Sequence, residues 1–384
     1  MTPAARHQAA IEILDRILAG RPAEQALTGW ARSARYAGSK DRAAIRDLVF
    51  DVLRRKRSCA HLGGATTGRG LILGHLRACD QDPDTVFTGA HYAPARLTET
   101  ERDPRPGPMP EAVALDCPDW LLPAFKASLG QDYAPVLDAL RQRAPVFLRV
   151  NLARTGRDAA IRCLAEDAIT AQPHDLAPSA LEITHNARAL SRSRAYREGL
   201  VELQDAASQA VITDLPALDG LRVLDFCAGG GGKSLAMAAL GAKVTAHDAN
   251  PARMRDLPAR AARAQAQLTI TESPAGPYEL VLTDVPCSGS GSWRRAPAGK
   301  WRLTPSQLTE LHQIQARILD HAARHVQPGG WLAYVTCSLL DSENSAQADS
   351  FGQRRSAFRL QVARRLTPID GADGFFLSLF RHLP

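Results

Sequence analysis

The chain has 384 residues, a formal net charge of +7, 45% hydrophobic residues and 23% charged residues. Length and composition predict two or three packed domains and exclude a disordered chain. No run of 18 uncharged apolar residues occurs, which excludes a transmembrane helix and a membrane partner. We expect no signal peptide, because charges interrupt the apolar start of the chain at Arg6, Glu12, Asp15 and Arg16.

The cysteines and arginines narrow the class of protein further. Seven cysteines are widely scattered and form no CxxC pair. This pattern predicts neither a disulfide framework nor a metal site, so we expect a cytoplasmic protein with reduced thiols and no metal. Of the 47 basic residues, 41 are arginine. Arginine suits phosphate recognition, but a GC-rich genome explains the excess equally well, so nucleic acid is one candidate partner.

The first half of the chain is predicted to be mainly helical. Apolar residues at helical spacing run through 9–18 and 45–53, with Ser39 as the expected N-cap of the second segment, and 70–79 is a third helix. The proline-rich stretch RDPRPGPMPEAV cannot sustain a helix and predicts a linker. Helical periodicity resumes at PDWLLPAFKASLG and continues to about residue 143. A small α+β module follows, with strands in PVFLRVNLA and LEITHN.

From residue 220 the pattern changes to regular alternation of strands and helices. Four apolar strands are predicted in LRVLDF, KVTAHD, YELVLTDV and GWLAYVTC. Short apolar strands alternating with helices indicate an α/β fold, a Rossmann-like, doubly wound and mostly parallel sheet. Ligands of such folds bind beyond the carboxyl ends of the strands, so the residues there are the candidate site.

A glycine-rich loop follows the first of these strands. Its glycines allow close backbone approach to a ligand at a helix N-terminus. Three interpretations of the loop compete. A P-loop would need glycine at position 227, and a dinucleotide fingerprint disagrees at Lys233. The third is the looser glycine loop that binds S-adenosyl-L-methionine in class I methyltransferases, and the loop by itself does not choose among them. Asp248, after the second strand, suits the ribose hydroxyls of NAD or S-adenosyl-L-methionine, or a plain helix N-cap. The loop residues are Cys227, Ala228, Gly229, Gly230, Gly231, Gly232 and Lys233.

Two thiols stand at equivalent strand ends. Cys287 follows Asp284 beyond one strand, and Cys337 lies just beyond the next. A lone buried cysteine is usually a small apolar residue, but two at neighbouring strand ends favour a function. A redox pair is one alternative, and it would need sulfurs that face each other. The other is covalent catalysis, in which a thiolate adds to carbon 6 of cytosine and carbon 5 then attacks an electrophilic methyl group.

The motifs VLDFCAGGGGKS, VLTDVPCSGSGSWRR, AYVTCS with the downstream SEN, and GLVELQDAASQ resemble those of the Sun (Fmu) family of RNA cytosine-5 methyltransferases. The resemblance covers residues 118–384. A weaker resemblance extends to the N-terminal helices, where GSKDRAAIRDLVFDVLRR looks like the NusB-like domain of bacterial 16S ribosomal RNA methyltransferases. The resemblance implies a methyltransferase that transfers a methyl group from S-adenosyl-L-methionine to an RNA cytosine.

The resemblance also implies roles for individual residues. Cys337 would be the nucleophile, Cys287 would assist release of the RNA, Asp284 would contact the cytosine and Lys233 would lie near the active site. The residue types alone do not choose between the thiols, since DNA cytosine methyltransferases use a cysteine after proline, which favours Cys287. The cofactor would lie against the loop from Cys227 to Lys233 and against Asp248 and Asp284.

The sequence departs from the family pattern at two positions. Gly230 stands where the family usually has proline, which predicts a looser loop. The acid that normally contacts adenine has no obvious counterpart, and Glu272 in LTITESPAG is the substitute we select. Two further groups of residues are candidate RNA contacts. They are Arg149, Asn151, Gln204 and Asp205, and the mixture of Trp293, Arg294, Arg295, Lys300, Trp301 and Arg302.

Four parts of the chain are expected: a NusB-like helical RNA-binding domain at 1–80, a linker at 81–117, a small α+β RNA-recognition module at 118–200 and the catalytic domain at 201–384. We expect a monomer that acts on RNA, most simply 16S ribosomal RNA. Another ribosomal or transfer RNA is the nearest alternative. A non-catalytic RNA-binding or assembly factor and a nicotinamide-dependent oxidoreductase are alternatives from other classes, and the intact thiols and the missing GxGxxG argue against them.

Overall fold

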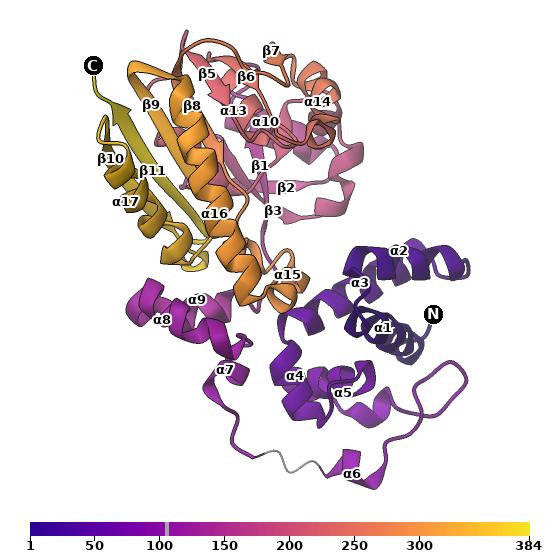
Figure 1. The fold of residues 1–384 in the computed structure, drawn as a ribbon. Helices are drawn as coiled ribbons and strands as arrows, with labels where there is room; N and C mark the ends of the chain where they lie inside the picture. The colour runs from indigo at the N-terminus through magenta and orange to yellow at the C-terminus, as the bar shows by residue number, and fades with distance from the viewer. Residues whose placement is uncertain (104–106) are drawn as a thin grey trace. The chain divides into compact units, whose positions relative to one another are not determined.

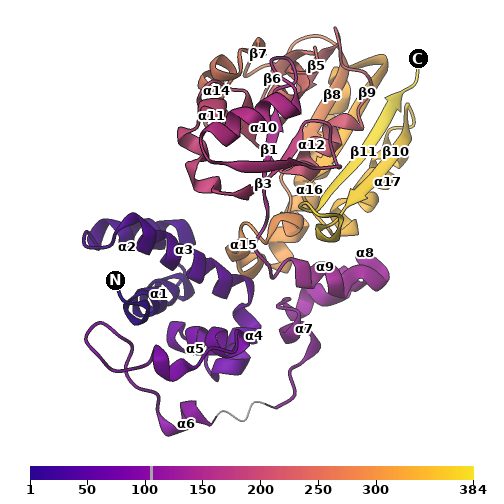
Figure 2. The ribbon, with the colours of Figure 1, turned by 180° about the vertical axis from the view of Figure 1, so that it is seen from behind.

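The computed structural model describes residues 1–103 and 107–384 and divides the chain into two compact units. The first comprises Met1–Arg143 and Trp293–Arg302, and the second comprises Ala144–Ser292 and Leu303–Pro384. The elements of each unit are drawn in Figure 1 and, from behind, in Figure 2. Residues 104–106 of the predicted linker lie outside the described residues.

The first unit is helical, as its periodicity predicts. Its core contains fully buried side chains such as Ile13, Val49 and Leu71. Two helices approach so closely that glycine is required, because a Cβ on Gly74 would lie 1.8 Å from the Cys59 carbonyl oxygen. The five longest N-terminal helices are α1 (Pro3–Leu18), α2 (Ala23–Ser33), α3 (Ser39–Arg54), α4 (Lys56–Gly63) and α5 (Gly68–Ala78).

The start of α3 differs by one residue from the prediction. Gly38, and not Ser39, is the N-cap, and the Asp41 carboxylate accepts a hydrogen bond from the Gly38 N–H at 3.3 Å. The acid at the third helical position thus accepts from the N–H of the cap residue, and the helix begins at Ser39.

The helices between residues 81 and 143 also belong to the first unit. Asp116 anchors this region, because its fully buried carboxylate accepts hydrogen bonds from the backbone N–H groups of Arg57 and Ser58 and from Arg141 Nε. The two compact units divide after Arg143. These elements are η1 (Pro83–Thr85), α6 (Glu99–Arg102), α7 (Glu111–Ala114), η2 (Asp119–Leu121), α8 (Leu122–Leu129), η3 (Gly130–Asp132) and α9 (Tyr133–Ala139).

The segment 293–302, which contains α15 (Pro297–Arg302), packs into the helical unit. The Trp293 ring is 2% exposed and meets the Phe125 ring edge-on at 5.9 Å between centroids. Lys300 Nζ donates to the carbonyl of Arg54 at 3.2 Å. The expected base-stacking surface is therefore wrong for three residues of this segment, since Trp293, Arg294 and Lys300 are buried.

The large sheet of the second unit has the strand order β10-β11-β9-β8-β5-β6-β7. The pairs β5–β6, β6–β7, β5–β8 and β8–β9 are parallel, whereas β11 is antiparallel to both β9 and β10. The predicted mostly parallel sheet is thus confirmed. The strands are β5 (Arg222–Asp225), β6 (Lys243–Ala246), β7 (Leu268–Ile270), β8 (Tyr278–Asp284), β9 (Val326–Thr336), β10 (Phe358–Leu366) and β11 (Phe375–His382).

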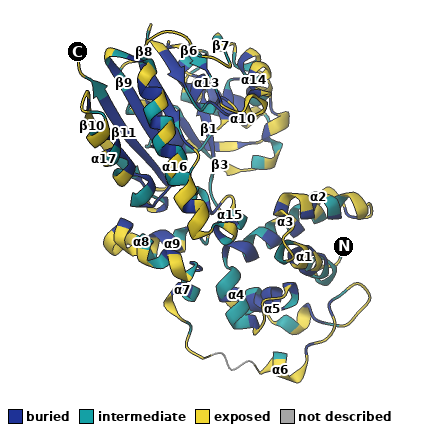
Figure 3. Cartoon of the chain, in the orientation of Figure 1, coloured by how far each residue is buried: buried dark blue, intermediate teal, exposed yellow. Residues whose placement is uncertain are grey.

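Helices cover both faces of this sheet. Leu280 and Leu282 of β8 join the core on the side of α12 (Ala206–Thr213) and α13 (Gly232–Ala238). Val281 joins the core on the side of α16 (Pro305–Ala322) and α17 (Ser345–Arg354). Burial on both faces explains the continuous apolar runs in the sequence, and Figure 3 shows the central strands as mainly buried. A further helix, α14 (Leu257–Ala264), connects β6 to β7.

The second unit also contains a four-stranded antiparallel sheet in the order β2-β3-β1-β4. The two faces of this sheet pack against different helices. Leu148 packs with α10 (Arg157–Glu166), and Phe147 packs with α12, which covers the larger sheet. The predicted strands near 146–150 and 181–185 are present. The strands are β1 (Val146–Val150), β2 (Thr170–Pro173), β3 (Ala180–His185) and β4 (Val201–Leu203), with the short helix α11 (Arg194–Arg197) before β4.

We expect Trp293→Ala to lower the free energy of unfolding of the helical unit by about 3–5 kcal/mol, because it removes a buried aromatic side chain. Urea unfolding followed by far-ultraviolet circular dichroism measures the change. Trp120→Ala is the matched control, since that ring is 37% exposed. If the Trp293→Ala protein is as stable as wild type and binds RNA more weakly, Trp293 stacks on bases as the sequence suggested and the burial argument is wrong.

Candidate active site

The glycine loop between β5 and α13 needs glycine at two positions. Gly229 and Gly231 have φ angles of +51° and +78°, in the left-handed region. A Cβ on Gly231 would also lie 2.1 Å from Leu257 Cδ1. A residue with a Cβ atom would therefore be strained at either position, and at Gly231 it would also clash with Leu257.

Side chains from three elements hold this loop. The Asp248 carboxylate accepts a hydrogen bond from the Gly229 N–H at 2.9 Å. Arg149 of β1 donates to the carbonyl of Gly232. Arg253, half exposed, pairs with Asp248 at 3.1 Å. Asp248 therefore lies at the loop, as predicted, and supports it directly.

Arg260 occupies the space that Gly230 leaves. Its guanidinium donates to the Gly230 carbonyl, and a Cβ on Gly230 would lie 2.9 Å from Arg260 Nη1. Arg260 Nε lies 3.4 Å from the Glu202 carboxylate of β4. Arg260 therefore contacts the loop at the position where the family usually has proline, and the looser loop stays a prediction.

A small cavity of about 240 Å³ lies at the glycine loop. Asp225, at the end of β5, lines it and is fully buried. Asp225 Oδ2 accepts a hydrogen bond from Ser234 at 2.6 Å, but Oδ1 has no partner among the described residues. Burial raises the pKa of Asp225 to about 6, so the carboxylate is largely ionised at neutral pH. A buried acid with an unused acceptor suits a cationic, hydrogen-bond-donating ligand.

A larger cavity of about 910 Å³ is lined by Asp248 together with Glu272. Phe226 and His247 lie beside them, with ring centroids 5.0 Å apart. Glu272, the substitute acid selected from the sequence, is therefore placed in the same cavity as Asp248. Acids next to aromatic rings suit a ligand with a sugar and a planar base.

Lys233 and Asp284 form an ion pair at the end of β8. Lys233 Nζ lies 2.6 Å from Asp284 Oδ2 and 5.1 Å from the centroid of the Phe375 ring. The Lys233 side chain is nearly buried, whereas the Asp284 side chain is 34% exposed. Lys233 thus fixes a carboxylate that a bound molecule can still reach.

The two thiols are in contact. Because β8 and β9 are neighbouring parallel strands, the segments that follow them meet, and Cys287 Sγ lies 3.4 Å from Cys337 Sγ. The hydrogen bond between the thiols and burial raise the pKa of Cys287 well above its usual range. The thiols lie side by side as predicted, and the facing sulfurs also meet the geometric requirement of a redox pair.

Sequence reasoning missed one buried acid at this site. Glu343 is 0% exposed and accepts hydrogen bonds from both segments that carry the thiols. The signal was present in the SEN motif, to which we assigned no role. The sequence does not show that this carboxylate is buried, and its burial is what marks Glu343 as part of the site.

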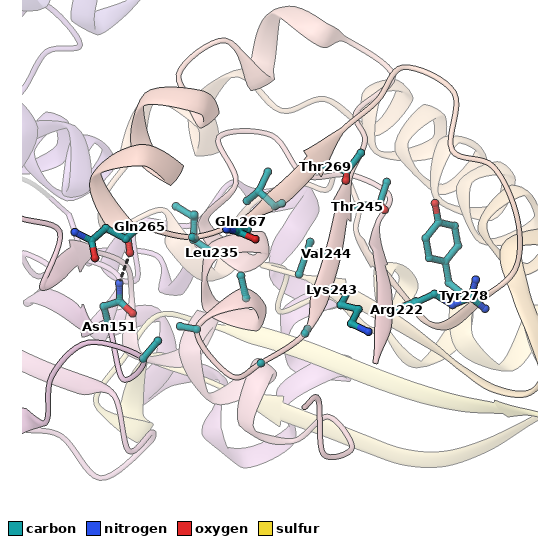
Figure 4. A pocket seen from close by; sticks show the side chains of 18 residues that line it. Asn151, Arg222, Leu235, Lys243, Val244, Thr245, Gln265, Gln267, Thr269 and Tyr278 are labelled. Carbon is teal, nitrogen blue, oxygen red and sulfur yellow. Dashed lines mark hydrogen bonds between the residues drawn. The ribbon is translucent and has the colours of Figure 1, made fainter. Parts of the chain in front are cut away.

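The expected RNA contacts around β1 are wrong for two residues. Arg149 is 5% exposed and Asn151 is 8% exposed. Asn151 Nδ2 donates to the carbonyls of Gly199 and Ala264 and so joins the small sheet to α14. Asn151 also lines a cavity of about 610 Å³ at the amino-terminal ends of β5 and β6, drawn in Figure 4. No residue predicted to be catalytic or to bind the cofactor lines this cavity.

The residues that the structure describes are 1–103 and 107–384. No helix in these ranges is long and apolar enough to cross a membrane. No group of three or more His, Cys, Asp and Glu in the same ranges could hold a metal ion. All seven cysteines are free thiols.

The strand order, the antiparallel β11 and the glycine loop after β5 define a class I methyltransferase fold. A model of the family described as 16S rRNA methyltransferase RsmB/F matches residues 213–377, and a ferredoxin-like domain of RsmF/B-like methyltransferases matches residues 117–189. The chain belongs to the RsmB/F family of 16S ribosomal RNA methyltransferases.

Two relatives carry the printed name ribosomal RNA small subunit methyltransferase B. The protein from Erwinia tasmaniensis is 33% identical over 280 residues, which is 68% of this chain and 65% of the relative. The protein from Escherichia coli O6:K15:H31 is 30% identical over 329 residues, which is 81% of this chain and 72% of the relative. The chain thus spans about two thirds of the length of these relatives.

Solved structures share the fold. The crystal structure of the protein PH0851 superposes with a TM-score of 0.77 at 22% identity and covers 99% of both chains. A methyltransferase homolog protein from Pyrococcus horikoshii gives a TM-score of 0.62 at 21% identity, covering 71% of this chain and 97% of that chain.

Proposed function

We propose that this protein transfers a methyl group from S-adenosyl-L-methionine to carbon 5 of a cytosine in 16S ribosomal RNA. The observation that carries the proposal is the contact between Cys287 and Cys337, 3.4 Å apart at neighbouring strand ends, in a chain of this family. Contact between the sulfurs alone suits dithiol redox chemistry equally well. Family membership and the adjacent Lys233–Asp284 pair favour methyl transfer.

Cys337 acts as the nucleophile. Its thiolate forms a bond from Sγ to carbon 6, and the electron pair of the 5,6 double bond makes carbon 5 nucleophilic. S-adenosyl-L-methionine supplies the electrophilic methyl group that carbon 5 takes, and the electron pair of the broken sulfur–methyl bond stays on the donor sulfur, which gives S-adenosyl-L-homocysteine. Asp284 contacts the ring at nitrogen 3, and Lys233 holds that carboxylate in place. A base then accepts the carbon 5 proton, and the 5,6 double bond forms again as the Sγ–carbon 6 bond breaks and its electron pair returns to Cys337 as the thiolate. Cys287 assists this release.

The two cavities support the binding of the methyl donor. The cationic, hydrogen-bond-donating part would lie in the smaller cavity against Asp225, whose Oδ1 is unused, and against the loop from Cys227 to Lys233. The adenosine part would lie in the larger cavity, with Asp248 near the ribose and Glu272 near the adenine. Asp284 lines the smaller cavity and would face both donor and cytosine.

The substrate assignment rests on the family and on charge. Residues 1–80 contain fourteen Lys and Arg against seven Asp and Glu, which favours an RNA-binding, NusB-like role for this part of the chain. The α+β module would add RNA contacts from the second unit. A ribosomal RNA substrate implies a cytoplasmic enzyme, and we propose that it acts as a monomer, which light scattering on the free protein tests.

Bisulfite sequencing of ribosomal RNA from a deletion strain tests the proposed function. We expect the loss of a single methylcytosine in 16S RNA, restored by the wild-type gene and not by Cys337→Ala. An unchanged 16S methylation pattern would contradict the substrate, and loss of a methylcytosine elsewhere would name another RNA.

Substitution of each thiol separates their roles. Cys337→Ala should reduce methyl incorporation by roughly 10⁴-fold or more, because the nucleophile is lost. Cys287→Ser should still form the covalent RNA complex but release it slowly. Gel shift under denaturing conditions and tritiated methyl transfer measure both. Loss of activity in Cys287→Ser with activity retained in Cys337→Ala would reverse the assignment.

The affinity for the methyl donor should depend on pH through Asp225. Below a pKa of about 6 the Asp225 carboxylate takes up a proton and loses the charge that attracts a cationic ligand. We expect the Kd for S-adenosyl-L-methionine to rise about tenfold between pH 7.5 and pH 5, as measured by calorimetry. Asp225→Asn should bind more weakly and show no such change. A constant wild-type Kd over this range would contradict the role of Asp225.

A further inference from the structure

A single buried carboxylate joins the two segments that carry the thiols. Glu343 lies at the end of η8 (Asp341–Glu343) and is 0% exposed. Ser288 follows Cys287 in one segment, and Ser338 follows Cys337 in the other. The two segments are 50 residues apart in the chain, so no local structure relates them.

Each segment donates hydrogen bonds to Glu343. Ser288 donates through its backbone N–H to Oε1 at 2.8 Å and through Oγ to Oε2 at 2.5 Å. Ser338 Oγ donates to the same Oε2 at 2.6 Å. Gln315 Nε2 donates to Oε1 at 3.0 Å, and it also donates to the carbonyl of Pro286, one residue before Cys287. Oε2 is thus shared by the residues that follow both thiols.

Glu343 is itself held in place by β9. The Tyr334 hydroxyl donates to the Glu343 carbonyl at 2.6 Å. The next residue, Asn344, accepts from Thr336 Oγ1 at 2.6 Å and donates to the Ser338 carbonyl at 2.9 Å. The carboxylate is therefore fixed before any ligand arrives, as a positioning group must be.

The charge of Glu343 is not matched by a cation. Among the residues that the structure describes, no Lys, Arg or His nitrogen lies within 4.0 Å of its carboxylate. Burying an ionised carboxylate without a cationic partner is costly, and hydrogen bonds from neutral donors are what offset the cost. A neutral side chain would fill the same space without that cost, but it could not accept from all of these donors.

We propose that Glu343 is a positioning residue that holds Cys287 and Cys337 in register for the reaction. This inference rests on the proposed function for its catalytic consequence, but the spacing of the thiols is a property of the free protein. Among the described residues no hydrogen bond joins Glu343 to either thiol, although its charge contributes to raising the pKa of Cys287. It acts through Ser288 and Ser338, so its loss should change the placement of the sulfurs while leaving the cofactor loop on β5 and β6 intact.

The first test measures the spacing of the thiols and needs no RNA. Diamide should oxidise the Cys287–Cys337 pair to a disulfide, with loss of two hydrogens from the protein and reduction of diamide to the hydrazine. Peptide mapping by mass spectrometry follows the reaction. We expect Glu343→Gln and Ser338→Ala to close the disulfide at least tenfold more slowly than wild type. Closure at the wild-type rate in both variants would overturn the proposal.

The second test measures the catalytic consequence. RNA with 5-fluorocytidine at the target traps the covalent complex with Cys337, because carbon 5 then carries no proton to lose. We expect Glu343→Gln and Ser338→Ala to form this complex roughly 10- to 100-fold more slowly, since misplacement of reacting atoms by about 1 Å costs up to 100-fold. The Kd for S-adenosyl-L-methionine should stay within twofold of wild type.

Ser378→Ala is the matched control. Ser378 lies on β11, is 0% exposed and has a hydroxyl without a hydrogen-bond partner among the described residues, so the same serine-to-alanine change should leave both rates at wild-type values. Wild-type trapping rates in Glu343→Gln and Ser338→Ala would overturn the catalytic part of the inference. Absence of a trapped complex with the wild-type protein would instead contradict the proposed function, whereas the diamide result would still decide the positioning role.

Discussion

The structure of the site depends on one constraint, the parallel pairing of β8 with β9. Asp284 pairs in register with Val335, so the chain leaves both strands at the same edge of the sheet. Only this pairing brings Cys287 and Cys337, 50 residues apart, into contact at 3.4 Å. The Lys233–Asp284 pair and the glycine loop reach the same edge because β5 lies beside β8. The chemistry is therefore concentrated where parallel strands end.

Buried charge at this edge is the main cost of the arrangement, and neighbouring elements offset it. Lys233 neutralises Asp284, Ser234 donates to Asp225, and neutral donors surround Glu343. The small antiparallel sheet contributes too, because Arg149 of β1 holds the glycine loop and Glu202 of β4 anchors Arg260. The α+β module is thus part of the support of the cofactor loop, whatever RNA contacts it makes.

Local sequence patterns predicted some parts of the molecule and failed at others for identifiable reasons. The four apolar strands and the helices of residues 1–80 were predictable because continuous apolar runs and helical periodicity report burial directly. The antiparallel pair β10–β11 was missed, because the alternation in FRLQVARRL mixes exposed arginines with apolar residues and has no strong strand signal. The segment with Trp293 and Lys300 looked like an RNA surface, since aromatic and basic residues have the same composition whether buried or exposed.

The sequence pointed to the proposed reaction class, because the motifs around Cys287 and Cys337 resemble those of a family of RNA cytosine-5 methyltransferases, and it predicted the regular order of strands and helices. It also placed Asp248 and Glu272 as candidate acids at one site. The tertiary structure alone decided that Arg260 contacts the loop at Gly230, that Arg149 and Asn151 are internal supports, and that Glu343 links the two thiol segments. The physical reason is that a polar side chain acquires its role from burial and from partners distant in the chain, and spacing along the sequence encodes neither.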